Sequence, residues 1–124
     1  MKSEIITFAT LLSLIISIKT SYADTITFNC VFNNYSDKRG NHQYKNPHLF
    51  TVVWDKSANL AYQVSRKKEV KVKVIDSPDM ISFFENSSTG NAILTSIIKL
   101  NGDAVNSRNI LGMSSQAYGY CKIE

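Results

Sequence analysis

The stretch EVKVKVI, residues Glu69–Ile75, decides the fold class. Valine occupies positions 70, 72 and 74, whereas lysine occupies positions 71 and 73. Successive side chains of a β-strand point to opposite faces, so this alternation is typical of a strand. We expect the three valines to face one way and the two lysines to face the other.

The same alternation recurs in short runs along the chain, and turn residues separate these runs. Asn101-Gly102 is the strongest hairpin signal, because both central residues of a type I′ turn need positive φ. Asp55-Lys56-Ser57 predicts another turn, and Gly90 can adopt positive φ in the polar connection Asn86–Asn91. Besides residues 69–75, the expected strands are Thr25–Phe32, Leu49–Trp54, Asn59–Val64, Met80–Glu85, Ala92–Lys99, Asp103–Asn109 and Gln116–Lys122.

About eight short strands in local hairpins predict an all-β fold, an antiparallel meander that forms a small barrel or a sandwich. The two cysteines, Cys30 and Cys121, lie near opposite ends of this meander. An even pair of cysteines in an exported chain predicts a disulfide, and this one would tie the first strand to the last. Such a link suits neighbouring strands that close a barrel, although the sandwich stays open at this point.

The N-terminal residues have the pattern of a signal peptide. Lys2 precedes the apolar run Ile5–Ile18, and Thr20–Ala23 places small residues before a cleavage site after Ala23. The run is shorter than the about 20 apolar residues that span a bilayer, so we expect no membrane span after cleavage. The sequence thus predicts a signal-peptide helix within residues 1–23 and one β domain at residues 24–124. Export would follow the Sec route to the periplasm or the medium.

The charge of the chain narrows the class of partner. The formal net charge is +4, and removal of residues 1–23 takes away two lysines and one glutamate. This mild positive charge suits a protein or another anionic macromolecule. It lacks the concentrated basic stripe of a nucleic-acid binder, so we do not expect nucleic acid as the partner.

The polar segment Asn33–His48 lacks apolar periodicity, and we expect it to be a long loop, a kind of segment that is often functional. Basic and aromatic side chains gather in this segment and just before Glu69. Lysines on the polar face of a strand also protect a sheet edge from pairing, so a purely structural role is the alternative. The candidate partner-binding residues are Tyr35, Lys38, Arg39, His42, Tyr44, Lys45, Arg66, Lys67 and Lys68.

We find no catalytic arrangement in the sequence. His42 and His48 lack a further metal ligand or catalytic partner, and no serine lies in a G-x-S-x-G turn. The aspartates fall in turns, and no spacing singles out a carboxylate pair. We therefore expect a non-enzyme without metal or cofactor. Arg108 is expected to form a structural ion pair with Glu85, and the alternative is a ligand-contacting patch around Arg108.

Several runs of residues carry a resemblance to a known family. They are Phe28-Asn29-Cys30, Phe83-Phe84-Glu85, Thr95–Ile98, Gly102–Asn109 and Ser115–Cys121. Together they resemble an uncharacterised family of small Sec-exported alphaproteobacterial proteins with the C-terminal pattern AV[HN]SR[HN] followed by SQxYGxC. The family tends to carry histidine where this chain has Asn106 and Asn109, so any metal or proton chemistry of those histidines would be lost here.

A weaker likeness is to the periplasmic inhibitors of C-type lysozyme, which are exported eight-stranded barrels with a cysteine near each end. Their serine and tyrosine/lysine loop motifs have no convincing counterpart in this chain. The sequence thus predicts a small secreted or periplasmic binding protein, in the manner of a Sec-dependent effector of a host-associated bacterium. An inhibitor of a lysozyme-like or other hydrolase is the alternative.

Overall fold

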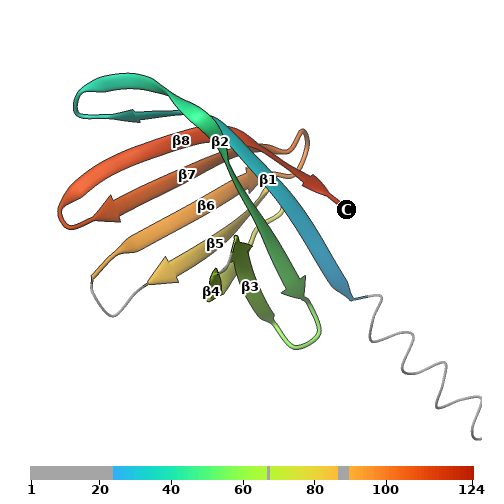
Figure 1. The fold of residues 1–124 in the computed structure, drawn as a ribbon. Helices are drawn as coiled ribbons and strands as arrows, with labels where there is room; N and C mark the ends of the chain where they lie inside the picture. Colours follow the sequence, from blue (N-terminus) through green and yellow to red (C-terminus); the bar gives the residue numbers. More distant parts are fainter. Residues whose placement is uncertain (1–23, 67, 87–89) are drawn as a thin grey trace, which may run out of the picture.

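The computed structural model describes residues 24–66, 68–86 and 90–124, and within them the chain forms a closed antiparallel barrel (Figure 1). Each strand pairs with the next along the chain, and β1 also pairs with β8. The strands are β1 (Thr25–Asp37), β2 (Gly40–Asp55), β3 (Leu60–Ser65), β4 (Lys68–Asp76), β5 (Met80–Asn86), β6 (Ala92–Ile98), β7 (Asp103–Ile110) and β8 (Met113–Ile123). The predicted signal peptide lies outside the described residues, among which no helix is long and apolar enough to cross a membrane.

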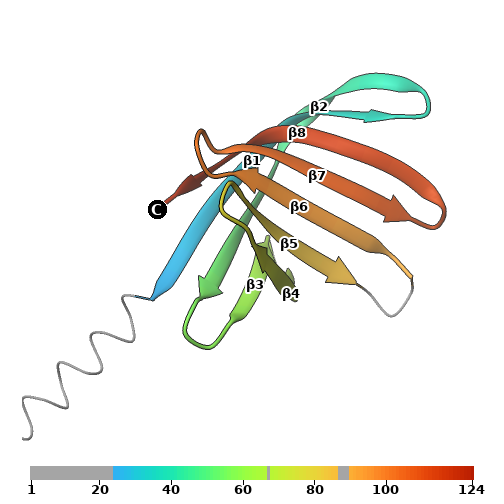
Figure 2. The same cartoon turned by 180° about the vertical axis from the view of Figure 1, so that it is seen from behind.

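The up-and-down topology gives the barrel two different ends. The β1–β2, β3–β4 and β7–β8 connections lie at one end, which we call the hairpin end. The β2–β3, β4–β5 and β6–β7 connections lie at the other, which we call the termini end because Asp24 and Glu124 are there. Figure 2 shows the β1–β2 and β7–β8 hairpins on the side opposite the C-terminus.

Alternating apolar side chains fill the barrel. On β4, Val72 is buried and Val70 and Val74 are half-buried, whereas Lys71 and Lys73 are exposed, as the alternation predicts. Burial of each large apolar side chain stabilises the fold by about 1.5–3 kcal/mol. The buried core consists of Phe28, Cys30, Phe32, Phe50, Val52, Trp54, Ala61, Val72, Ile81, Phe83, Ile97, Ala104, Ala117 and Cys121.

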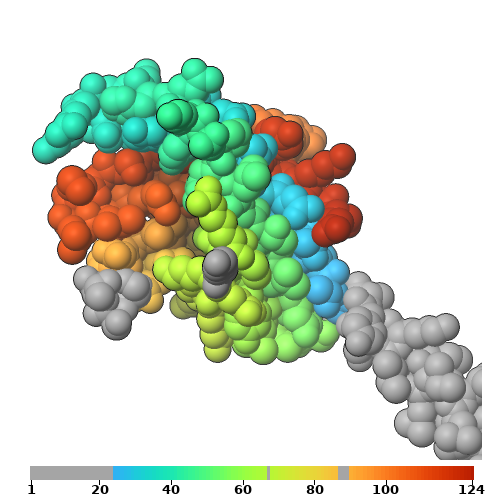
Figure 3. All heavy atoms as spheres, in the orientation of Figure 1, coloured from blue at the N-terminus to red at the C-terminus, as the bar shows by residue number. Residues whose placement is uncertain are grey.

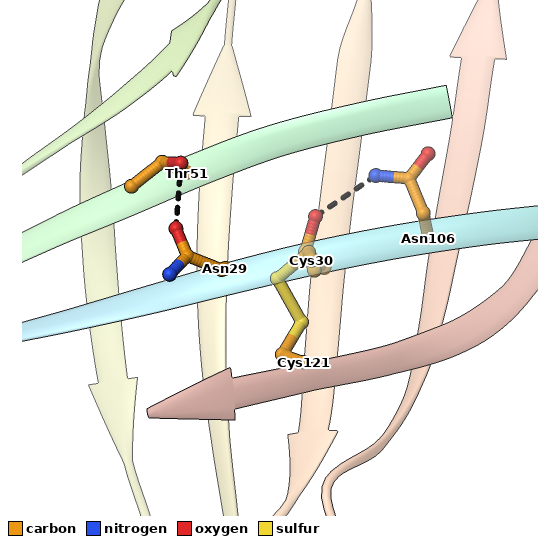
Figure 4. Close-up of a disulfide and its surroundings, with 6 residues drawn as sticks. Asn29, Cys30, Thr51, Asn106 and Cys121 are labelled. Atoms are coloured by element: carbon orange, nitrogen blue, oxygen red, sulfur yellow. Dashed lines mark hydrogen bonds between the residues drawn. A yellow bond between two sulfur atoms is a disulfide. The ribbon is translucent and has the colours of Figure 1, made fainter. Parts of the chain in front are cut away.

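A disulfide joins Cys30 of β1 to Cys121 of β8, as predicted (Figure 4). The two residues lie directly opposite each other in the β1–β8 pairing, with their Cα atoms 4.0 Å apart. The bond therefore crosses the seam where the first and last strands meet. Of the two architectures left open by the sequence, the barrel is the one formed.

The prediction of a long loop at Asn33–His48 is wrong, because this segment extends the β1–β2 hairpin. Pairing continues from Asn34 opposite Gln43 to Asp37 opposite Gly40. Between Phe32 and Asn34 the register shifts, and β2 carries extra residues including Pro47 on its side of the irregularity. A proline has no N–H to donate to a ladder, so a bulge is where a strand tolerates it.

The hairpin predicted at Asn101-Gly102 is formed, but the prediction of a type I′ turn is wrong. Gly102 has φ of 81°, whereas Asn101 is not among the residues with positive φ. The Gly102 N–H donates to the carbonyl of Ile98 at 2.8 Å, which makes a longer connection between β6 and β7. The Asn101 side-chain oxygen accepts from the Asp103 N–H at 2.9 Å, so Asn101 acts as a local cap and needs no positive φ.

Candidate binding site at the hairpin end

A pocket of about 830 Å³ opens at the hairpin end, between the β1–β2 and β7–β8 hairpins. Tyr35, Lys38 and Arg39 line it from the first hairpin. Arg108 and Met113 line it from the second. Figure 3 shows the β1–β2 hairpin (teal) above the β7–β8 hairpin (orange-red), so residues far apart in the chain share one site.

Arg108 points into the barrel from β7. In the pairing register it lies opposite Ile93 on β6, and Ile93 lies opposite Glu85 on β5. Ile93 and Glu85 are buried, so this row faces the interior. The ion pairs of the described residues are His42–Asp37 and Lys99–Asp76, so the expected Arg108–Glu85 pair is not formed. The Nε atom of Arg108 is buried without a hydrogen-bond partner.

A chain of aromatic contacts connects the hairpin end to the core. The ring of Tyr35 stacks on His42 with centroids 4.9 Å apart and lies 4.7 Å from the ring of Tyr44. The ring of Tyr44 is 6.1 Å from His48, which meets Phe50 edge-on at 5.6 Å. Tyr35 and Tyr44 also pack against the buried core cluster. These aromatic contacts hold the extended part of the hairpin against the barrel.

Positive charge reaches the inner part of this site. Burial, followed by the charges of Arg108 and Arg66, lowers the pKa of His48. Burial also raises the pKa of Tyr44, and the charge of Arg108 partly opposes that shift. A neutral imidazole and a neutral phenol beside two guanidinium groups leave the local charge positive.

The carboxylate at the tip of the β1–β2 hairpin is already engaged. Asp37 accepts a hydrogen bond from His42 Nε2 at 2.9 Å and another from the Arg39 N–H at 2.8 Å. The hydrogen bond from His42, and then the one from Arg39, lower the pKa of Asp37. Asp37 therefore shapes the turn and does not neutralise the guanidinium of Arg108.

The structure brings most of the predicted partner-binding residues to one end of the barrel. Tyr35, Lys38 and Arg39 line the pocket, and His42 and Tyr44 stack on Tyr35. The exposed Lys45 lies in the irregular part of β2, and the exposed Arg66 and Lys68 flank the β3–β4 connection. Lys67 lies outside the described residues.

Charge is separated along the barrel axis. At the hairpin end, the described cations outnumber the carboxylates of Asp37, Glu69 and Glu85; these cations are Lys38, Arg39, Lys45, Arg66, Lys68 and Arg108. At the termini end, carboxylates outnumber Lys56, Lys99 and Lys122; these carboxylates are Asp24, Asp55, Asp76, Asp79, Asp103 and Glu124. A modest net charge therefore conceals a dipolar molecule, and its positive end carries the pocket.

Some residues of this site were not predicted. At the tip of the β7–β8 hairpin, Leu111 is 80% exposed and Met113 is 64% exposed. Leu111 also has φ of 53°, a conformation that is unusual for a residue other than glycine. Exposed apolar side chains at a turn gave no periodic signal, and only the fold shows that they flank the pocket.

A buried polar pair lies further inside the barrel. Asn106 is 1% exposed, and its Nδ2 donates to Thr95 Oγ1 at 2.8 Å, while its Oδ1 has no partner. Figure 4 shows Asn106 near the disulfide. Asn109, by contrast, is exposed. The two positions singled out by the sequence resemblance therefore face opposite sides of the barrel wall.

Comparison with protein-family models, curated proteins and solved structures finds no match. The resemblances noted from the sequence therefore stay expectations. Within residues 24–66, 68–86 and 90–124, no three histidine, cysteine, aspartate or glutamate side chains gather into a group that could hold a metal ion. The geometry of the site is that of a cationic pocket that is also lined by the aromatic ring of Tyr35 and by the exposed Met113.

Proposed function

We propose that this chain is a small exported binding protein, without enzymatic activity, that recognises an acidic segment of a protein partner at its hairpin end. The separation of charge along the barrel axis carries the proposal. A cationic face attracts an anionic partner over distance and raises its association rate. The carboxylates at the termini end would orient the barrel during the approach.

The exposed apolar residues favour a protein over a purely ionic polymer. Met113 lines the pocket together with Lys38 and Arg39, and the exposed Leu111 lies two residues before it at the β7–β8 turn. Protein interfaces combine arginine, methionine and aromatic side chains in this way, with cations at the rim. A purely ionic polymer would gain little from the apolar tip.

Export is supported by two features. The N-terminal residues have the pattern of a signal peptide, and the Cys30–Cys121 disulfide is of the kind that persists in oxidising compartments. A bacterial effector would meet its partner outside the cell. A lysozyme-like or other hydrolase is one such partner, and inhibition of a lytic assay by added protein would identify it.

Peptide binding tests the proposal. The chain is expressed with its own N-terminus and purified in oxidised form from the exported fraction. The probe is a fluorescent peptide of alternating glutamate and leucine with an amidated C-terminus, and the control peptide has glutamine in place of glutamate. We expect Lys38→Glu with Arg39→Glu to weaken anisotropy-detected binding of the acidic peptide by about tenfold or more, because two attractive rim charges become repulsive.

The matched control reverses Lys71 and Lys73, which are exposed on the outer face of β4. This pair of substitutions changes the net charge by the same amount, so an effect of net charge alone would weaken binding equally in both variants. Equal losses, or equal affinity for the glutamate and glutamine peptides, would refute recognition at the hairpin end.

A further inference from the structure

The guanidinium of Arg108 is a half-buried charge that the described part of the chain leaves uncompensated. Glu85 shares its inward-facing row but makes no ion pair with it, and Asp37 is engaged by His42 and Arg39. The Nε atom is buried and unpaired. Holding a charge partly out of water without a counter-charge is costly, so this arrangement suits an anion that arrives from outside.

The pocket around Arg108 is large enough for a small molecule. Its volume of about 830 Å³ falls within the range of small-molecule sites, which is roughly 300–1,000 Å³. The charged groups that line it are Asp37, Lys38, Arg39 and Arg108, so the balance is positive. Apolar side chains lie beside the charge, because Ile110 and Met113 follow Arg108 along the β7–β8 hairpin and also line the pocket.

These observations identify one ligand chemistry. We infer that the pocket binds a monocarboxylate with an apolar body, held by the guanidinium of Arg108 and by apolar contact with Ile110 and Met113. An arginine fork matches the two oxygens of a carboxylate and can donate two parallel hydrogen bonds. The ring of Tyr35 is engaged by the rings of His42 and Tyr44, so the ligand body lies against the aliphatic side of the pocket.

This inference goes beyond recognition of an acidic segment, because it concerns one carboxylate inside the pocket and not the charges on the rim. The carboxylate has two possible sources with the same chemistry. One is a free aliphatic acid, and the other is the C-terminal residue of a peptide. Octanoate and N-acetyl-leucine represent these two sources, and octanamide and N-acetyl-leucinamide are their neutral counterparts.

Titration of the full exported protein by NMR tests the inference. We expect octanoate, N-acetyl-leucine or both to shift the amide signals of Ile110, Met113 and Ser115. The amides should bind at least about tenfold more weakly, since they lack the charge that the arginine fork holds. Binding of octanoate alone would identify a free acid as the ligand, and binding of N-acetyl-leucine alone would identify a chain terminus.

Substitution of Arg108 separates its binding role from a structural one. We expect Arg108→Met to weaken carboxylate binding by about tenfold or more without lowering the melting temperature, because a half-buried unpaired charge is replaced by an apolar chain of similar length. Arg108→Lys keeps the charge but loses the fork, so its affinity should fall between those of the wild type and the methionine variant. The matched control is Lys122→Met on the termini end, which should bind as the wild type does.

Several outcomes would overturn the inference. They are no binding of either acid, equal binding of acid and amide, unchanged affinity in Arg108→Met, and shifts confined to a separate pocket, which is lined by Trp54 and Ile97 among others. None of these outcomes would bear on the proposed function, because that function is tested by binding of the glutamate–leucine peptide to the variants Lys38→Glu and Arg39→Glu. Conversely, a peptide-binding failure would leave the carboxylate titration unaffected.

Discussion

The backbone of Gly119 on β8 lies closer to β1 than a residue with a Cβ atom would allow. A Cβ atom at this position would collide with the carbonyl oxygen of Val31 and would lie 2.8 Å from the Cα of Phe32. Gly119 pairs with Phe32 just where the β1 register shifts, so the backbone has little room to move. We expect Gly119→Ala to lower the free energy of unfolding by about 1–3 kcal/mol, measured by urea denaturation.

Gly90 provides the contrast for this prediction. A Cβ atom there meets nothing within 4 Å, but the residue has φ of 86°, which carries its own conformational cost. Gly90→Ala should therefore cost only about 1 kcal/mol, through the backbone alone. If both variants lost the same stability, close packing of β8 on β1 would not be the reason for glycine at position 119.

At the scale of single residues, the sequence predicted the disulfide, but the ion pair that it predicted between Arg108 and Glu85 is not formed. Alternation placed Asn106 and Arg108 on one face of a strand, yet both are polar, so nothing indicated that this face is the interior. The expected partner Glu85 does lie in the same row. The intervening Ile93 on β6 is visible only once the pairing register is known.

At the scale of elements, the seven strands other than β2 begin within three residues of the positions that alternation predicted, and the main failure was the β1–β2 extension. On β1, Phe28, Cys30 and Phe32 are buried at even positions, whereas beyond the bulge the ring that packs on the core belongs to Tyr35, at an odd position. A bulge changes which alternate residues face the core, so a period-two pattern is interrupted there. Polar aromatic residues in place of aliphatic ones then made the segment resemble a loop.

His48 on β2 also makes the stability of the fold depend on pH. The pKa of His48 is lowered from 6.5 by burial and by the charges of Arg108 and Arg66. The unfolded chain therefore binds a proton at this histidine more readily than the folded chain does. Stability contributed by neutral His48 is fully present above pH 6.5, and it is lost as the pH falls from there through the folded pKa.

Melting temperatures measured across this acidic window test the effect. We expect the wild type to lose stability in this window and a His48→Gln variant to show a flatter profile, because glutamine does not titrate. The lowered pKa of Asp37 acts in a separate and more acidic window, below 3.8, so the two contributions can be told apart. Parallel profiles for the wild type and the variant would contradict the role of His48.

At the scale of the whole molecule, the charge separation depends on topology. The basic residues of the β1–β2 hairpin and those of the β3–β4 hairpin are far apart in the sequence. In an up-and-down barrel every second connection lies at the same end, so these groups converge. The sequence alone showed two basic clusters and a small net charge. Their gathering at one end of the barrel required the closed order of the strands.

Closure of the barrel also sets the last prediction. Cys30 and Cys121 are separated by 91 positions, and their bond links β1 to β8 across the seam. A cross-link over a loop of this length removes conformational freedom from the unfolded chain and is worth about 4–5 kcal/mol on the chain-entropy account. That is a large part of the about 5–15 kcal/mol that stabilises a typical domain.

We expect the double variant Cys30→Ala, Cys121→Ala to lose about 4 kcal/mol in urea denaturation, with a steeper denaturant dependence because its unfolded state is more expanded. Wild-type protein unfolded in the presence of a reductant should behave in the same way. A loss below about 1 kcal/mol would mean that the β1–β8 strand pairing holds the seam closed and that the covalent bond adds little to it.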